Sequence, residues 1–259
     1  MRSFKASLKI ITFLLLSALL VPPQMLVMMF HKGKGAYFIP FVWENLVRMI
    51  FQIRYKIEGT PLKNAQTFYM CNHLSYLDVP LLGSILPASF VAKSEVEKWP
   101  VFGFLSKLQQ TEFIERRRTA IADEAAKIGK TVASGRSLII FPEGTSSSGY
   151  DVKPFKSSLF TLALGPGNEN IFIQPVTISL LKVDGRVPAN KDEQDHYAWP
   201  LDLDMELPEH LFRFAKTSGA DLTVTFHEPV RARDFEDRKV LAKTCHDSVS
   251  KGLVVAKAA

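Results

Sequence analysis

A histidine and an aspartate stand five positions apart in the segment "CNHLSYLDVP". An imidazole has an unperturbed pKa of about 6.5, so a histidine such as His73 suits a general base that works near neutral pH. A carboxylate such as Asp78, bonded to the other ring nitrogen, would fix the tautomer and stabilise the protonated ring. The same spacing also fits a turn in which Asn72 or Ser75 caps a helix. Catalysis and capping both remain open from the pair alone.

Two further polar clusters carry groups that suit substrate binding. The segment "QTEFIERRR" ends in three arginines, and the planar guanidinium of Arg116 suits bidentate recognition of a phosphate. The segment "FPEGTSSSG" offers Glu143, Gly144 and Thr145, whose backbone amides, hydroxyl and carboxylate suit an anion or a polyol. Each cluster also has an explanation without function. The arginines would then form only a solvated basic turn, and the second segment only an ordinary loop rich in glycine and serine.

Short apolar strands must position these clusters. The pattern predicts strands at residues 55–58, 67–71, 89–93, 111–116, 137–144, 171–179 and 221–230. It predicts helices over residues 120–134 and 208–216, and two more that begin at residue 41 and at Ser157. Apolar strands separated by helices predict an α/β fold with a mixed, largely parallel sheet flanked by helices. Ligands of such sheets bind beyond the carboxyl ends of the strands, so we expect the three clusters to converge at one edge.

An uncharged apolar run precedes this domain. Residues 10–30 contain no charged side chain, and about 20 apolar residues suffice for a helix to cross a membrane. Pro22 and Pro23 remove backbone donors, so we expect them to kink or end the helix. Because cations flank the run on both sides, a crossing helix and a re-entrant helical hairpin both remain open. We expect residues 1–45 to anchor the chain to a membrane and residues 46–259 to form one α/β domain.

Composition narrows the function classes. Hydrophobic residues make up 47% of the chain and charged residues 22%, which excludes a disordered protein. The net charge of +6 accompanies no basic stripe interleaved with aromatics, so lipid headgroups are favoured over nucleic acid as the partner. Two cysteines give no disulfide framework, in agreement with a reducing compartment. The sequence lacks a GxSxG elbow, nucleotide-binding glycine loops and metal-ligand spacing, so we expect no metal and no bound cofactor.

Taken in order, the motifs resemble the glycerolipid acyltransferase family, whose best-known members are 1-acyl-glycerol-3-phosphate acyltransferases. The resemblance spans residues 45–230 and rests on the patterns NHxxxxD, FIxR and FPEGT and on a strand that contains Pro-Val. The matching residues are Asn72, His73, Asp78, Phe113, Ile114, Arg116, Phe141, Pro142, Glu143, Gly144, Thr145, Gln174, Pro175 and Val176, and Lys93 stands at a further position typical of the family.

The resemblance implies that His73 is the base and Asp78 its partner. His73 would take a proton from the hydroxyl of a lysophospholipid such as 1-acyl-sn-glycerol-3-phosphate, which attacks the thioester of acyl-CoA or acyl-carrier protein without an acyl-enzyme. The expected product is phosphatidic acid, made at the cytoplasmic face of the inner membrane. The resemblance also implies a set of substrate-binding residues, which includes Asn72 and Lys93. Arg116 would bind the acceptor's phosphate, and Pro175 would lie near the acyl-chain path. The glycerol or phosphate part would be bound by Glu143, Gly144 and Thr145.

Two positions depart from the family pattern. Ser146 stands where many members carry arginine, and Gln110 stands where a glycine is usual. The missing cation leaves the acceptor open between lysophosphatidate and another lysolipid, such as the lyso-ornithine lipid used by a similar bacterial branch. A non-catalytic lipid-binding protein of the same fold and a thioester or lipid hydrolase remain alternatives.

Overall fold

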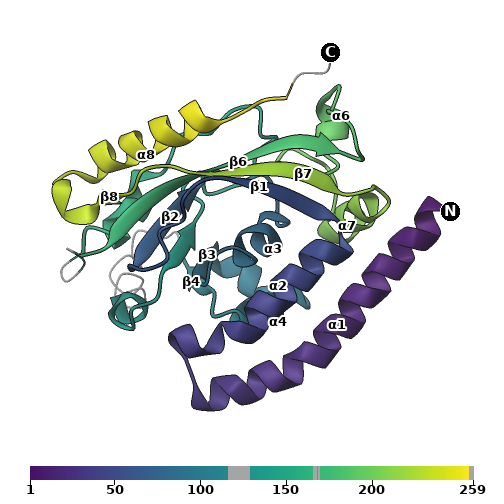
Figure 1. Cartoon of the computed structure of the whole chain (residues 1–259), viewed down its shortest axis with the longest axis horizontal. Helices are drawn as coiled ribbons and strands as arrows, with labels where there is room; N and C mark the ends of the chain where they lie inside the picture. Colours follow the sequence, from purple (N-terminus) through teal and green to yellow (C-terminus); the bar gives the residue numbers. More distant parts are fainter. Residues whose placement is uncertain (116–128, 166–167, 169, 257–259) are drawn as a thin grey trace.

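The structure, a computed structural model, describes residues 1–115, 129–165, 168 and 170–256, and it contains a mixed β-sheet covered by helices (Figure 1). The strand order is β1-β7-β6-β2-β5-β3-β4, with β8 beside β6. The strands are β1 Ile53–Gly59, β2 Thr67–Cys71, β3 Ser89–Lys93, β4 Glu112–Ile114, β5 Leu138–Ile140, β6 Phe172–Val183, β7 Ala220–Phe226 and β8 Val230–Arg231. Strand β6 runs antiparallel to β7 and β8, and the other neighbouring pairs are parallel. The predicted mixed, largely parallel sheet is confirmed.

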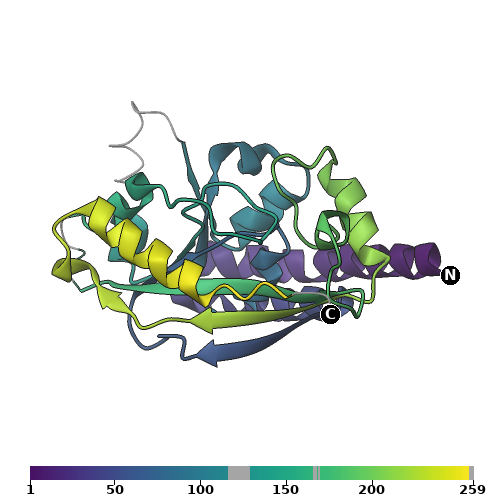
Figure 2. The same cartoon turned by 90° about the horizontal axis from the view of Figure 1, so that it is seen from above.

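Helices cover both faces of the sheet. Figures 1 and 2 show α8 on one side and α1 and α2 on the other. The α-helices are α1 Arg2–Phe30, α2 Phe38–Ile50, α3 Asp78–Gly83, α4 Phe102–Leu108, α6 Lys191–Gln194, α7 Leu207–Ala215 and α8 Arg238–Gly252. The 3₁₀ helices are η1 Gly33–Ala36, η2 Ser94–Lys98, η4 Ser157–Leu162 and η5 Ala232–Asp234.

The central strand β2 is buried on both faces. Phe68 and Met70 pack in the apolar cluster that includes residues of α8, whereas Tyr69 and Cys71 pack in the cluster that includes residues of α1, α2, α3 and α7. A strand enclosed in this way has a continuous apolar sequence, as β2 does. Burying one large apolar side chain stabilises a fold by about 1.5–3 kcal/mol, so the end of β2, where the polar segment begins, is firmly held.

Helix α1 continues past Pro22 and Pro23, so of the two expected effects, a kink or an end of the helix, the second is wrong. Its buried residues Ala6, Phe13, Ser17 and Gln24 recur on one face that packs against the domain. This packing on both sides of the prolines compensates for the backbone hydrogen bonds that they cannot make. The helix is long and apolar enough to cross a membrane by length and composition.

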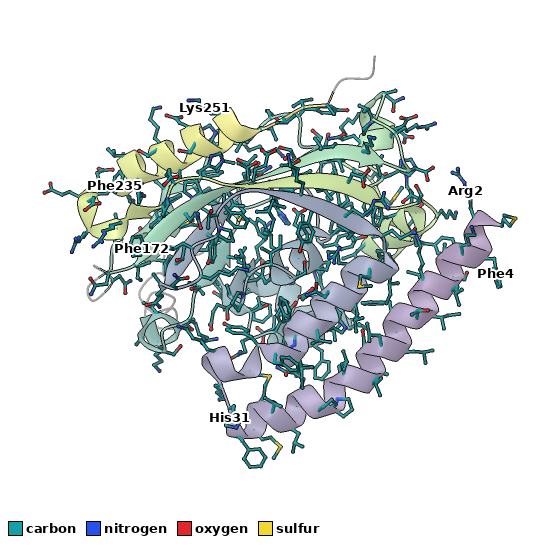
Figure 3. The ribbon with its side chains drawn as sticks, in the orientation of Figure 1. Arg2, Phe4, His31, Phe172, Phe235 and Lys251 are labelled. Atoms are coloured by element: carbon teal, nitrogen blue, oxygen red, sulfur yellow. The ribbon has the colours of Figure 1, made fainter. Side chains whose placement is uncertain are left out.

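Polar contacts also fasten α1 to the domain along its length. Lys9 Nζ donates to the carbonyl of Thr217 at 2.9 Å, and Trp43 Nε1 donates to Ser17 Oγ at 3.0 Å. Figure 3 shows Phe4 projecting from the other side of α1, away from the sheet. The expected boundary at residue 45 falls inside α2, and the division into an anchor and a domain stays a prediction.

Several element boundaries differ from the sequence prediction. The pattern over residues 221–230 predicts one strand, but β7 ends at Phe226 and β8 forms separately against β6. The helix that begins at Ser157 is a six-residue 3₁₀ helix. The predicted helix over residues 120–134 lies largely outside the described residues. Helices α4 and α8 are absent from the sequence prediction because α4 is short and the buried positions of α8 include small residues.

A buried histidine joins α7 to the turn after β2. His210 Nε2 lies 3.0 Å from the carbonyl oxygens of both Asp195 and Ala198. Because both partners only accept, Nε2 carries the proton, and Nδ1 accepts from the hydroxyl of Tyr76 at 2.9 Å. Burial lowers the pKa of His210 to about 4. The ring is therefore neutral near neutral pH, and its tautomer orients the Tyr76 hydroxyl.

We expect His210 to make the fold sensitive to acid. The pKa is about 4 in the folded protein and about 6.5 in the unfolded chain, so the unfolded state binds more protons between these values. The free energy of unfolding should therefore fall by on the order of 3 kcal/mol as the pH drops through this window. Thermal unfolding of the detergent-solubilised protein across this pH range measures the effect. His210→Gln should show a shallower loss, and an equally steep loss would contradict the assignment.

Candidate active site

His73 lies two residues after the end of β2, and the next turn brings Asp78, the first residue of α3, back onto its ring. His73 Nδ1 lies 2.8 Å from Asp78 Oδ2. The same oxygen accepts the backbone N–H groups of Leu74 at 2.7 Å and Ser75 at 3.0 Å. Because these donors identify Oδ2 as an acceptor, Nδ1 must be the donor of the His73–Asp78 bond. The five-residue spacing thus places the carboxylate against the imidazole.

The fourth donor to Asp78 comes from a distant part of the chain. Tyr197, in the segment between β6 and α7, donates its hydroxyl to Asp78 Oδ1 at 2.9 Å. Both side chains are fully buried, with exposed fractions of 0%. A buried carboxylate without such donors would cost several kcal/mol, so Tyr197 helps to keep Asp78 in place. Sequence reasoning missed Tyr197, because a tyrosine in a polar, proline-punctuated segment carries no signal of its partner.

Capping does not explain the polar residues of this segment. Helix α3 has no side-chain cap, and Ser75 Oγ instead accepts the N–H of Leu77 within the turn at 3.0 Å. Asn72 Nδ2 donates to the carbonyl of Ile178 at 2.9 Å, and its Oδ1 accepts the Ile178 N–H at 2.7 Å. Asn72 therefore ties the end of β2 to β6. Its role in substrate binding stays a prediction.

The remaining ring nitrogen of His73 is suited to accept a proton. With Nδ1 donating to Asp78, Nε2 carries the lone pair, and no hydrogen-bond partner of Nε2 lies among the described residues. The ring stacks on Phe141 with centroids 4.0 Å apart and an angle of 19° between the planes. The His73 side chain is 20% exposed, so it is held by its neighbours yet open to a ligand.

Glu143 lies beside His73 and bonds to its backbone. Glu143 Oε1 accepts the N–H of His73 at 2.7 Å, and Oε2 accepts the N–H of Lys153 at 2.9 Å. The backbone N–H of Ser147 donates to the carbonyl of His73 at 2.8 Å. Burial raises the pKa of Glu143 to about 7. The carboxyl group thus joins the loop after β5 to the loop after β2, and direct binding of substrate by Glu143 stays a prediction.

His73 opens onto a cavity of about 340 Å³, named here the catalytic cavity. Lys93, Gly144 and Thr145, all assigned to substrate binding from the sequence, also line it. A second cavity of about 150 Å³, the helical cavity, lies among α1, α2, α3, α4 and α7. The two cavities share wall residues, which are Tyr76, Val79, Val96, Trp99 and Ser106. The site therefore combines a candidate base with an adjoining apolar space.

Pro175, an expected binding residue, is not brought into this arrangement. Pro175 lies inside β6, where it pairs with Met70 and its carbonyl accepts the N–H of His227 at 3.0 Å. It lines neither cavity, and its proximity to an acyl chain stays a prediction. Arg116 lies outside the described residues. The clusters around His73 and Glu143 do meet at one edge of the sheet, as the parallel strands predict.

Comparison with known proteins connects this geometry to a family. A family model described as Acyltransferase matches residues 52–179, which include His73, Asp78 and Glu143. A lyso-ornithine lipid O-acyltransferase of Brucella abortus is 33% identical over 239 residues, covering 90% of this chain and 88% of that protein. A 1-acyl-sn-glycerol-3-phosphate acyltransferase of Neisseria gonorrhoeae is 30% identical over 179 residues, covering 69% of this chain and 66% of that protein.

A solved structure shares the fold over nearly the whole chain. The 1-acyl-sn-glycerophosphate acyltransferase of Thermotoga maritima superposes with a TM-score of 0.66 at 18% identity, covering 97% of this chain and 96% of that one. The motifs around His73, the sheet that carries them and the similarity to the Brucella protein over most of both chains agree with one another. The chain therefore belongs to the acyltransferase family and is an acyltransferase.

Proposed function

We propose that this protein transfers a fatty acyl group from a thioester to the hydroxyl of a lysolipid, with His73 as the general base. The observation that carries the proposal is the His73–Asp78 pair, in which Nδ1 of the ring bonds to the carboxylate while His73 lines the catalytic cavity. The adjoining helical cavity is lined mostly by apolar side chains, which suits a fatty chain. Relatives named for lysolipid acylation support the substrate class.

In the proposed reaction, His73 Nε2 takes the proton of the acceptor hydroxyl as the oxygen attacks the thioester carbonyl. The tetrahedral intermediate expels the thiolate, which receives the proton from the imidazolium. One O–H bond and one C–S bond break, and one C–O bond and one S–H bond form. Asp78 stabilises the imidazolium between the two steps. The donor is an acyl thioester of CoA or of acyl-carrier protein.

Direct transfer agrees with the chemistry of the neighbouring cysteine. Cys71 lies two residues before His73, but its side chain is fully buried in the sheet. Burial raises the pKa of this thiol well above its ordinary value. A buried, protonated thiol is a poor nucleophile, so an acyl-enzyme on Cys71 is disfavoured.

For the acceptor, we propose lyso-ornithine lipid, with lysophosphatidate as the second candidate. The Brucella relative matches more of this chain than the Neisseria relative does. Ser146 replaces the family's usual arginine, and its hydroxyl donates to the carbonyl of Trp199. Ser146 therefore links its own loop to the segment that contains Trp199, and it supplies no cation for a phosphate. An ornithine headgroup has a carboxylate and an amine but no phosphate, so it does not need that cation.

We further propose that α1 lies in the plane of the membrane at its cytoplasmic face. The helix packs against the domain from Ala6 to Gln24, and a helix crossing the bilayer would have to give up those contacts. Its outer face exposes large apolar residues, which include Phe4, Leu8, Ile11, Leu15, Leu19, Leu26 and Met29. A one-sided apolar helix suits the boundary between headgroups and acyl chains. Attachment of this kind brings the catalytic cavity to its lipid substrates.

His73→Ala should reduce acyl transfer by about 10²- to 10⁴-fold, the usual contribution of a general base. The assay incubates purified protein in mixed micelles with a thioester donor and a lysolipid, and it identifies products by mass. His31→Ala, at an exposed position after α1, is the matched control and should keep wild-type activity. Transfer by folded His73→Ala within tenfold of wild type would rule out the proposed base.

Competition between the two acceptors tests the second part of the proposal. Given equal amounts of lyso-ornithine lipid and lysophosphatidate, the wild type should acylate the former with the higher kcat/KM. Ser146→Arg should shift the ratio toward lysophosphatidate, because it adds a cation beside the catalytic cavity. Ser146→Ala loses the bond to Trp199 without adding charge and should not cause that shift. Wild-type preference for lysophosphatidate would refute the assignment of the acceptor.

A further inference from the structure

We infer that the helical cavity binds a fatty chain that carries a hydroxyl group, with Glu44 and Gln24 as the hydrogen-bonding residues. The inference rests on the proposed function and adds a specificity to it. The cavity walls are otherwise largely apolar and include Phe13, Leu20, Val47, Phe51, Phe102 and Leu105. Polar side chains in such a wall mark the part of a ligand that is recognised.

Both residues keep unused hydrogen-bonding atoms in the interior. Neither carboxyl oxygen of Glu44 has a hydrogen-bond partner within the described part of the chain, and the same holds for Gln24 Oε1. Glu44 is 1% exposed and Gln24 is 3% exposed. Each buried polar atom left without a partner costs about 1–3 kcal/mol. Residues that line a cavity and carry this cost are suited to a ligand that supplies the partners.

Both residues lie beside the C-terminal end of α4 in the wall of the helical cavity. Gln24 Nε2 donates to the carbonyl of Leu108 at 2.8 Å and to that of Ala36 at 3.1 Å, which fixes the amide. Gln109, which follows Leu108 in the chain, interacts with the carboxyl group of Glu44. Leu108 and Gln109 are consecutive residues at the end of α4, so Gln24 and Glu44 lie close to the same point. All four line the cavity.

The chemistry of the pair selects a hydroxyl. Burial raises the pKa of Glu44 well above its ordinary value, and the nearby side-chain amide of Gln109 offsets only part of this rise. A neutral carboxylic acid offers one O–H donor and a carbonyl acceptor, and Gln24 Oε1 adds a second acceptor. A hydroxyl both donates and accepts, so it can bond to the acid and the amide together. A saturated chain would leave these atoms unpaired.

The helical cavity adjoins the base closely enough for one ligand to occupy both spaces. Tyr76, Val79 and Trp99 line both cavities, so a chain whose reacting end is at His73 can continue between α2 and α4. The hydroxyl belongs either to the chain of the thioester donor or to the chain of the lysolipid acceptor. Both sources present the same group to Glu44, and separate arms of the experiment distinguish them.

The test measures preference for hydroxylated chains with the purified full-length protein. One arm compares octadecanoyl-CoA with hydroxyoctadecanoyl-CoA isomers, and the other compares lysolipids with and without a chain hydroxyl additional to the hydroxyl that is acylated. For at least one isomer in one arm, the wild type should show a kcat/KM ratio in favour of the hydroxylated chain. Glu44→Leu should lower this ratio roughly fivefold or more, as expected for one lost hydrogen bond. Glu44→Gln, which keeps a donor and an acceptor, should retain most of the preference.

Matched variants and a binding readout make the outcome decisive. Leu20→Met changes the apolar wall of the same cavity and should keep the wild-type ratio. Gln24→Leu should lower the ratio, and it replaces Glu44→Leu if that protein does not fold. Equal ratios in wild type and Glu44→Leu, or no preference in either arm, would overturn the inference.

Thermal unfolding separates this inference from the proposed function. Hydroxyoctadecanoic acid should stabilise the wild type more than octadecanoic acid does, and Glu44→Leu should lose that difference. Thermal unfolding needs no acyl transfer. It therefore tests the binding of a hydroxylated chain in the helical cavity even if no pair of donor and acceptor gives product. Equal stabilisation by both fatty acids in the wild type would overturn the inference by itself.

Discussion

The carboxylate of Asp78 is fully buried, and the cost of removing its charge from water governs how the site is built. Such a charge is tolerated only when hydrogen bonds replace the lost hydration. The replacement comes from two backbone N–H groups of the same turn, the ring of His73 and the hydroxyl of Tyr197. These four donors also determine which ring nitrogen of His73 holds the proton. The geometry of His73, the proposed base, therefore follows from satisfying one buried charge.

Holding this turn requires contacts from both neighbouring strands. Asn72 connects the end of β2 to Ile178 of β6, and Glu143 connects the loop after β5 to the backbone of His73. Parallel strands bring these loops to the same edge of the sheet, and the apolar clusters on its two faces fix the positions of the strands. Residues that look like substrate ligands in the sequence thus hold His73 in place. Helices α1, α2 and α4 add the helical cavity beside it.

Local sequence patterns were sufficient for most of the sheet. Apolar strands bounded by polar segments indicated β1 to β6, and the family resemblance of the HxxxxD pattern indicated the contact between His73 and Asp78. Contacts between distant segments could not be predicted, because one sequence does not show which side chains meet. Tyr197 on Asp78 and the approach of Gln24 to Glu44 are of this kind. The continuity of α1 through Pro22 and Pro23 likewise depends on packing, which local propensity omits.

Kinetics of Asp78→Asn test most directly whether the buried carboxylate makes His73 a base. Asparagine is close to aspartate in shape but cannot stabilise the imidazolium, so kcat/KM for acyl transfer should fall by about 10³- to 10⁴-fold across the pH range of activity. Thermal unfolding of the same preparation establishes that the variant is folded. A folded Asp78→Asn protein that retains kcat/KM within tenfold of wild type would contradict the role of this carboxylate in catalysis.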